Sequence, residues 1–129
     1  MRQFTYISTA AALAESDIDA ILESAQTRNP LNDITGFLLY NGRNFLQLIE
    51  GPRSALMTLM VRLAVDRRHS GIVRLEDHSI TKRVCPEWTM HRIQLSESVD
   101  RRRDELDQAL PPALDAVVRR TVLNFASLN

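Results

Sequence analysis

The Asn-Gly dipeptide at positions 41 and 42 constrains the fold more than any other short stretch of this sequence. Apolar runs flank it on both sides, at residues 34–40 and 45–49. Asn-Gly readily adopts positive φ, and between two apolar runs it is the strongest short-range signal for a β-hairpin. We therefore expect two antiparallel strands joined at this dipeptide.

The second strand of this hairpin contains one amide side chain, Gln47, among apolar residues. Because strand side chains alternate in direction, Gln47 shares one face with Phe45 and Ile49, while Leu46 and Leu48 lie on the other. A buried amide needs hydrogen-bond partners for its donors and its acceptor. Gln47 is thus either a core residue bonded to neighbouring backbone or a residue that faces a polar molecule bound against the sheet.

Length and composition indicate one ordinary globular domain. The chain has 129 residues, of which 44% are hydrophobic and 25% charged, and its formal net charge is zero. No long-range field therefore favours nucleic acid or an anionic membrane as a partner. The single cysteine, Cys85, excludes an intramolecular disulfide and fits a reducing compartment. With no apolar stretch of membrane-spanning length and no signal peptide, we expect a cytoplasmic protein.

Apolar periodicity predicts a regular order of strands and helices up to residue 95. A helix is expected from Ser16, which precedes the acids of a first turn, to about Thr27, and Pro30 prevents its continuation. A second helix follows Pro52. The expected strands are residues 3–9, 33–40, 43–50, 72–80 and 87–95. This order predicts an α+β, ferredoxin-like βαββαββ fold with a five-stranded mixed sheet and both helices on one face.

Residues 97–129 differ in pattern from the preceding domain, which we place at residues 1–96. A charged segment at 98–110 and a Pro-Pro pair precede an apolar helical stripe, formed by Leu114, Val117, Val118, Thr121, Val122 and Phe125. The sheet also has a second apolar face, which carries Ile7, Leu46, Leu48 and Ile93. A sheet that is apolar on both faces must be covered on both. We expect the C-terminal helices to cover this second face, with a second subunit as the alternative.

Strand parity brings four distinctive side chains to the face that the two main helices cover. They are Tyr6, Gln47, Trp88 and Met90. Asn29, next to Pro30, lies at the edge of the same space. Taken singly, each has an ordinary structural role as a half-buried strand residue or as core filler. Their convergence is what favours a binding site.

Several spaced motifs resemble those of one family of sensory domains. The segments are YIS at 6–8, RNPLNDITGFLLY at 28–40, NFLQLIEG at 44–51 and EWTM at 87–90. Together they resemble the blue-light-using-flavin (BLUF) photoreceptor domain. The resemblance covers residues 3–95, and it rests on the set of motifs rather than on any one of them.

The resemblance implies that the domain binds a flavin, normally FAD with FMN or riboflavin as alternatives, between the two main helices. Tyr6 is similar to the family's redox-active tyrosine, Gln47 to its switching glutamine, and Asn29 to the asparagine that bonds the flavin carbonyl edge. Trp88 and Met90 resemble the pair on the last strand that shifts during signalling. The further flavin contacts implied by the resemblance are Ile21, Ala25, Phe45, Arg62, Asp66 and His69.

Two positions depart from the pattern of the family that the sequence resembles. Arg28 stands where Asn is common, and Cys85 stands where Phe is common. Neither touches the pair of Tyr6 and Gln47. Arg28 is counted among the flavin contacts, because it bears on how the tail of the flavin is held.

The amide chemistry of Gln47 agrees with the role that the resemblance implies. Reversing a side-chain amide exchanges donor for acceptor at nearly constant shape. If Tyr6 gives an electron and a proton to the excited flavin and then recovers them, Gln47 can remain in the reversed or tautomeric arrangement. The result is a bistable polar network coupled to the sheet.

We therefore expect a blue-light photoreceptor that is not itself an enzyme and that signals through a partner protein or through its own homo-oligomer. The residues alone leave two other functions open. One is a small acylphosphatase-like hydrolase, although no Gly-rich anion loop joins the first strand to the first helix. The other is a colourless ferredoxin-like dimerisation module in which Gln47 only packs. No second Cys or His stands at ligand spacing, so we expect no metal site.

Overall fold

The computed structural model describes residues 1–10, 13–67 and 70–127. Its centre is a five-stranded sheet with the strand order β4-β1-β3-β2-β5. Strand β5 runs parallel to β2, and the other neighbouring strands are antiparallel. The strands are β1 (Arg2–Thr9), β2 (Thr35–Tyr40), β3 (Asn44–Gly51), β4 (Ser70–Ser79) and β5 (His91–Arg92). The predicted ferredoxin-like arrangement with a mixed sheet is confirmed.

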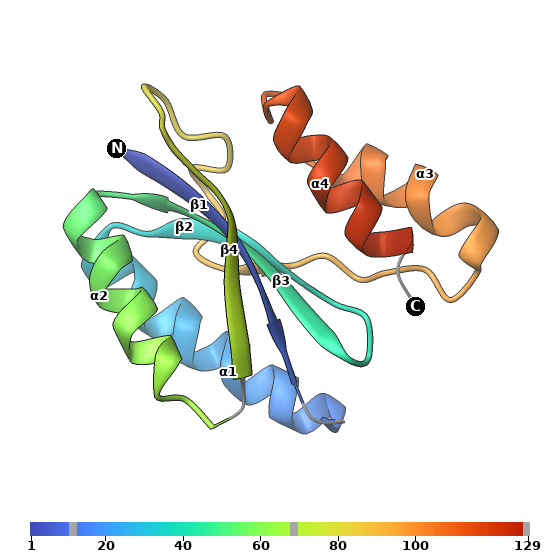
Figure 1. Cartoon of the computed structure of the whole chain (residues 1–129), viewed down its shortest axis with the longest axis horizontal. Coiled ribbons are helices and arrows are strands. Elements are labelled where there is room, and N and C mark those ends of the chain that lie inside the picture. Colours follow the sequence, from blue (N-terminus) through green and yellow to red (C-terminus); the bar gives the residue numbers. More distant parts are fainter. Residues whose placement is uncertain (11–12, 68–69, 128–129) are drawn as a thin grey trace.

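Helices cover the sheet on both faces (Figure 1). On one face lie α1 (Glu15–Arg28) and α2 (Arg53–Ala64), and on the other lie α3 (Val99–Ala109) and α4 (Ala116–Ser127). Each face has its own apolar cluster, the first containing Tyr6 and Phe45 and the second containing Leu46 and Leu48. The alternation expected along β3 therefore divides its side chains between two separate cores.

The hairpin between β2 and β3 uses its two turn residues in different ways. Gly42 has a φ of 93°, which a residue with a Cβ rarely adopts. Asn41 accepts hydrogen bonds at its side-chain Oδ1 from the backbone nitrogens of Arg43, at 3.0 Å, and Asn44, at 2.8 Å. The first residue thus closes the turn with its side chain, and the second supplies the unusual backbone angle.

Helix α1 begins one residue before the predicted start at Ser16. The backbone nitrogen of Ala14 donates to the Asp17 carboxylate at 3.0 Å, so Asp17 satisfies the helix end in place of the predicted serine cap. After Arg28 a short 3₁₀ helix, η1 (Asn29–Asn32), contains Pro30. Asp33 then adopts a φ of 59° and turns the chain into β2.

The predicted last strand, residues 87–95, is mostly wrong, since only His91–Arg92 are in strand conformation. The backbone nitrogen of Trp88 donates to the carbonyl of Cys85 at 3.2 Å and closes a turn next to Pro86. This turn interrupts the alternation on which the prediction relied. Met90 is buried in the first cluster, whereas Trp88 packs against the second. The predicted common face of these two side chains is therefore wrong.

The predicted stripe of the last helix is shifted by one position. Val118, Val122 and Phe125 are buried as expected, but Val117 is 55% exposed. Leu123 and Ala126 are buried instead. Helix α4 packs against α3 as well as against the sheet (Figure 1). Its buried surface is therefore wider than contact with the sheet alone would require.

Candidate functional site

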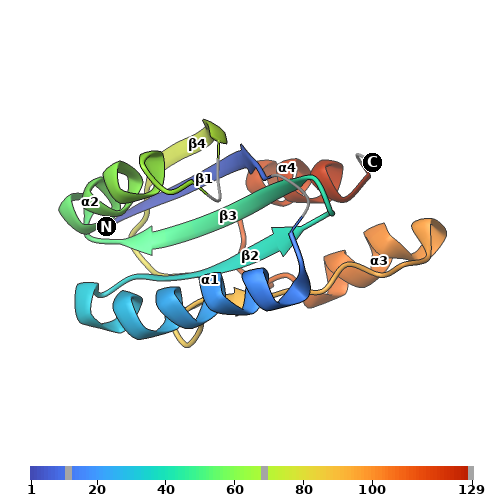
Figure 2. The same ribbon diagram turned by 90° about the horizontal axis from the view of Figure 1, so that it is seen from below.

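Tyr6 and Gln47 lie directly opposite each other in the antiparallel pairing of β1 and β3. Side chains in such a pair share one face of the sheet and lie close together. The Tyr6 side chain is fully buried, and Gln47 is 5% exposed. The common face predicted for these two residues is confirmed, and β3 runs between α1 and α2 when the sheet is seen from the side of these helices (Figure 2).

Gln47 contacts Met90, which comes from the loop before β5. The Gln47 amide nitrogen Nε2 donates to the Met90 sulfur at 3.4 Å. A second amide, Gln26 of α1, donates from Nε2 to the Met90 backbone carbonyl at 2.9 Å. Met90 is thus held at its sulfur by the sheet and at its backbone by α1. Sequence reasoning missed Gln26, because an exposed polar residue on a helix gives no signal of a distant partner.

Asn29 holds the neighbouring residue of the same loop. It is fully buried as the first residue of η1, and its Nδ2 donates to the Thr89 carbonyl at 2.7 Å. The predicted position of Asn29 at the edge of the space beside Gln47 agrees with this contact. Residues from α1, η1 and β3 therefore meet on one two-residue segment, Thr89-Met90.

Three buried side-chain oxygens in this region lack hydrogen-bond partners within residues 1–10, 13–67 and 70–127. They are the Tyr6 hydroxyl, Asn29 Oδ1 and Gln47 Oε1. Leaving one such group unpaired in a protein interior costs about 1–3 kcal/mol. Gln3 Oε1 and Thr5 Oγ1 are also buried without a partner in these residues, but the three oxygens of Tyr6, Asn29 and Gln47 lie in one region beside Met90, and this clustering favours a bound group as their partner.

A groove of about 610 Å³ opens between α1 and α2. Its volume falls within the range of small-molecule sites. Of the predicted contacts, Arg28 and Arg62 line it, one from the last turn of each helix. Sequence reasoning missed the other lining residues. They are Ala20, Glu23, Ser24 and Thr27, whose helical spacing along α1 was visible, and Leu31 of η1.

The other residues that were predicted to contact the flavin do not line this groove. Ile21, Ala25 and Phe45 are buried in the apolar cluster that also holds Tyr6. Asp66 is half-buried just beyond α2, and His69 lies outside the described residues. Trp88 lies on the opposite side of the sheet, edge-to-face with Phe37 at 6.1 Å between ring centroids. Trp88 therefore does not line the space beside Gln47.

Burial controls the ionisation of Tyr6. It raises the pKa of the phenol above its ordinary value, and the positive charge of Arg28 opposes part of that rise. A phenol in such an apolar environment keeps its proton at neutral pH. Tyr6 is accordingly a proton donor with no acceptor in the described part of the chain.

Within the described residues, no helix is long and apolar enough to cross a membrane. The same residues contain no group of three or more His, Cys, Asp or Glu side chains that could hold a metal ion. The three unpaired oxygens are the main indication of a ligand, and the groove, which Tyr6, Asn29 and Gln47 do not line, is a separate one.

A family model described as "BLUF: Sensors of blue-light using FAD" matches residues 1–91. The chain belongs to the BLUF family. It is a blue-light sensor domain of the flavin-binding type, as the sequence motifs predicted.

Similar sequences and solved structures support this BLUF assignment. The chain is 33% identical over 126 residues to photoactivated adenylate cyclase subunit beta of Euglena longa, covering 96% of this chain and 14% of that protein. The structure described as "BlrB - a BLUF protein, dark state structure" has a TM-score of 0.75 and 34% identity, covering 98% of this chain and 96% of that one. Klebsiella pneumoniae BlrP1 with FMN and cyclic diGMP has a TM-score of 0.82 and 27% identity, covering 98% and 34%.

The BLUF site as described suits a flavin. A flavin ring has apolar faces and a polar edge of carbonyls and ring nitrogens, so it needs aliphatic neighbours and a few placed polar groups. Ile21 and Ala25 are buried apolar residues that would supply the first kind of contact, and the unpaired oxygens of Tyr6, Asn29 and Gln47 would supply the second. These residues fit the group that the family description names.

Proposed function

We propose that this BLUF domain binds its flavin between α1 and α2 and that Tyr6 and Gln47 form the light-sensitive switch. The observation that carries this proposal is the direct pairing of Tyr6 with Gln47, each with an unpaired buried oxygen. Asn29, which has a third such oxygen, holds the edge of the ring. Arg28, Arg62 and Asp66 lie toward the tail of the molecule, beyond the ring.

When bound, the flavin supplies absorption of blue light and an excited ring that takes up an electron and a proton. Tyr6 holds a proton at its hydroxyl in the dark, because burial disfavours its anion. After illumination Tyr6 would give up this proton together with an electron, and it would later recover both. Tyr6 therefore ends the cycle unchanged, and the lasting difference resides in Gln47.

Reversal of the Gln47 amide would alter its bond to Met90. In the structure Nε2 donates to the Met90 sulfur, and reversal or tautomerisation would present a different group to that sulfur. A sulfur is a weak acceptor, so this bond is broken at low cost. Met90 and the loop that it belongs to would then move relative to β3, and this movement is the first structural step of the signal.

The signal leaves through the opposite face of the sheet and residues 97–129. Side chains of β3 alternate between Gln47 on one face and Leu46 and Leu48 on the other, where α4 packs. Packed faces of this kind change between discrete arrangements. We infer that residues 1–129 sense light without catalysing a reaction and that a partner protein or a second copy of this chain receives the signal.

We propose FAD as the natural flavin, with FMN and riboflavin as alternatives. The family description names FAD, and the BlrP1 structure was obtained with FMN. Arg28 and Arg62 both line the groove, and arginine side chains bind phosphate through charge-assisted hydrogen bonds. This favours a phosphorylated flavin over riboflavin.

The test is light-induced difference absorption of the purified protein loaded with FAD. The wild type should show a small shift of the flavin band to longer wavelength under blue light, reversed in the dark. Gln47→Leu should bind FAD and lose the shift. Gln94→Leu, at an exposed site, is the control and should keep it. A reversible shift of wild-type size in Gln47→Leu would refute the proposed switch.

A further inference from the structure

A second polar network lies on the other face of β3, centred on Glu50. Glu50 is fully buried three residues after Gln47, so its side chain points to the opposite face of the strand. Its Oε1 accepts hydrogen bonds from Thr35 Oγ1 at 3.2 Å, from the Cys85 backbone nitrogen at 2.8 Å and from the Cys85 sulfur at 3.2 Å. Its Oε2 accepts from Gln3 Nε2 at 3.3 Å and the Val84 nitrogen at 3.1 Å.

These contacts account for the acceptor positions of one carboxylate. They join β1, β2, β3 and the loop before β5 at a single buried group. Hydrogen bonds to a carboxylate are stronger than those between neutral groups. The loop at residues 84–85 is therefore anchored to the sheet chiefly by Glu50.

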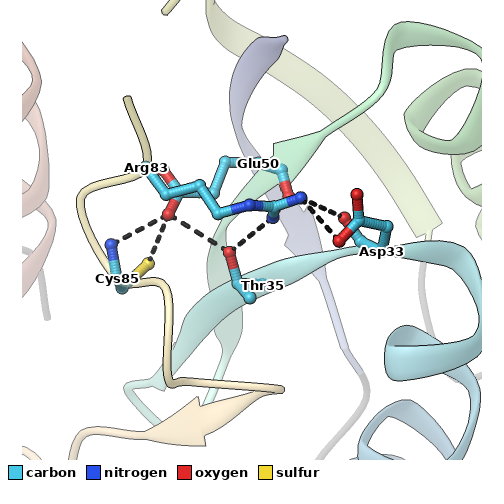
Figure 3. Close-up of polar contacts among 5 residues, drawn as sticks. All are labelled: Asp33, Thr35, Glu50, Arg83 and Cys85. Atoms are coloured by element: carbon cyan, nitrogen blue, oxygen red, sulfur yellow. Dashed lines mark hydrogen bonds and ion pairs between the residues drawn. The ribbon is translucent and has the colours of Figure 1, made fainter. Parts of the chain in front are cut away.

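Arg83 completes the network, as Figure 3 shows. Its Nη1 donates to Thr35 Oγ1 and to the Glu50 backbone carbonyl, each at 2.9 Å. Its Nη2 forms an ion pair with Asp33 Oδ1 at 2.9 Å and donates to the Asp33 carbonyl at 2.6 Å. Thr35 thus accepts from Arg83 and donates to Glu50, which links the cation to the buried carboxylate through one hydroxyl.

Short chain segments connect this network to Asn29 on one side and to Met90 on the other. Asp33 directly follows η1, whose first residue is Asn29. Cys85 lies five residues before Met90, and the intervening chain makes a turn, with Trp88 nitrogen bonded to the Cys85 carbonyl. Five extended residues span at most about 17 Å, and the turn shortens that reach, so holding Cys85 limits where Met90 can lie.

We propose that Glu50, Arg83 and Cys85 are positioning residues that set where Met90 meets Gln47, and that the Cys85–Glu50 hydrogen bond changes when the domain is illuminated. This inference rests on the proposed function. When the Gln47 amide reverses and Met90 moves, residues 85–90 are displaced with it. Because Glu50 stays fixed in the sheet, this displacement alters the Cys85–Glu50 hydrogen bond. Cys85 belongs to the apolar cluster beneath α3 and α4, so the change reaches that cluster.

The Cys85 thiol is a suitable reporter of this coupling. Burial first, and then the neighbouring Glu50 charge, raises the pKa of the thiol above its ordinary value, so that it keeps its S–H proton. Cys85 is also the only cysteine in the sequence. An S–H vibration in a light-minus-dark infrared spectrum of this protein can therefore be assigned to one residue.

The decisive experiment is that infrared difference spectrum, recorded on the full chain loaded with FAD. We expect a difference band in the S–H region in the wild type, and its loss in Cys85→Ser. A wild-type protein that shifts its flavin absorption without an S–H band would overturn the coupling and leave the proposed function intact. Absence of any flavin shift would overturn the proposed function and this inference with it.

Substitutions at the anchor provide an independent measurement. Glu50→Gln keeps the shape of the side chain, but it replaces one carboxylate oxygen by an NH₂ group, which would face other hydrogen-bond donors. We expect it to keep the flavin shift, to slow dark recovery by about tenfold, and to lose the light-dependent hydrogen exchange of residues 84–92. Recovery slows because Met90 is no longer returned to the position that receives Gln47 Nε2.

Two variants complete this series. Glu87→Gln, an exposed acid of the same loop, should behave as the wild type in recovery and exchange. Cys85→Ser, whose hydroxyl can still donate to Glu50, should keep near wild-type recovery, whereas Cys85→Ala should recover more slowly. Equal recovery and equal light-dependent exchange in wild type, Glu50→Gln and Cys85→Ala would show that the network has no positioning role.

Discussion

The amide nitrogen of Gln47 and the sulfur of Met90 lie 3.4 Å apart and are joined by a hydrogen bond. The two residues are 43 positions apart in the chain. Gln47 belongs to the centre of the sheet, and Met90 belongs to a loop that α1 also holds through Gln26. If Gln47 switches as proposed, a change in the direction of its amide would act directly on a segment that connects both faces of the sheet.

Met90→Leu should separate the colour change from the structural response. Leucine has nearly the volume of methionine, so the free energy of unfolding should fall by less than about 1.5 kcal/mol. It has no acceptor for Gln47 Nε2, so Gln47 should still switch while the loop no longer follows. We expect a normal flavin shift but a reduced light-dependent difference in hydrogen exchange across residues 89–95.

Met60→Leu is the matched control for that variant. Met60 lies on α2 and packs against the same apolar cluster as Met90. It should retain both the flavin shift and the exchange difference. If Met90→Leu also retained the full exchange difference, the sulfur contact would have no part in transmission.

Tyr6→Phe should make the flavin-free protein more stable. The Tyr6 hydroxyl is buried without a partner in the described residues, so its removal should raise the free energy of unfolding by about 1 kcal/mol. Saturating FAD should reverse the order of stability, because the hydroxyl then has a partner. Chemical denaturation with and without FAD measures both quantities. A flavin-free Tyr6→Phe that is less stable than wild type would contradict this expectation.

The control for this substitution is Tyr40→Phe. The Tyr40 hydroxyl accepts a hydrogen bond from the Leu13 backbone nitrogen at 3.4 Å. Its removal should lower the free energy of unfolding by about 0.5 kcal/mol, with or without FAD. The two tyrosines should therefore shift stability in opposite directions when no flavin is present.

Val118 and Val117 test how α4 is attached to the sheet. Val118 is 1% exposed in the second apolar cluster, and its neighbour Val117 is 55% exposed. Val118→Ala should lower the free energy of unfolding by about 2 kcal/mol, and Val117→Ala by less than about 0.5 kcal/mol. If α4 transmits the signal, Val118→Ala should also reduce light-dependent exchange in residues 116–127. Equal effects of the two substitutions would mean that α4 packs differently in solution.

Arg62 should distinguish phosphorylated flavins from riboflavin. A single charge-assisted contact in a partly exposed groove corresponds to about tenfold in affinity. Arg62→Ala should weaken FAD and FMN by about that factor and leave riboflavin unchanged, as titration by fluorescence quenching would measure. Arg53→Ala, at the exposed start of α2, is the control. Equal loss for all three flavins would place Arg62 near the ring rather than near a phosphate.

The ion pair between Glu15 and Arg92 should make stability depend on pH in the acid range. The Arg92 guanidinium bonds the Glu15 carboxylate at 2.5 Å, and this hydrogen bond, aided by the Arg92 charge, lowers the pKa of Glu15. A carboxyl with a lowered pKa contributes stability above its unfolded pKa and loses it as pH falls through the folded pKa. Glu15→Gln should flatten that part of the thermal stability profile, and Asp19→Asn should not. An unchanged profile in Glu15→Gln would contradict the assignment.

Much of this fold follows from local sequence patterns. The Asn41-Gly42 turn and the alternation along residues 45–50 predicted the hairpin and the direction of Gln47 correctly. The expected family and the common face of Tyr6 and Gln47 were also confirmed. Strand and helix periodicity are properties of consecutive residues, and such patterns are readable without knowledge of distant contacts.

The placement of Trp88 and Met90 depended on tertiary contacts. Alternation put them on one face, but the turn at Cys85 and the bonds from Asn29 and Gln26 send Trp88 to one core and Met90 to the other. The network around Glu50 was equally invisible, because the donors to its carboxylate come from three separated segments, at Gln3, at Thr35 and at residues 84–85. Burying a carboxylate is favourable only when all of those donors converge, and their convergence is a property of the folded chain rather than of any stretch of its sequence.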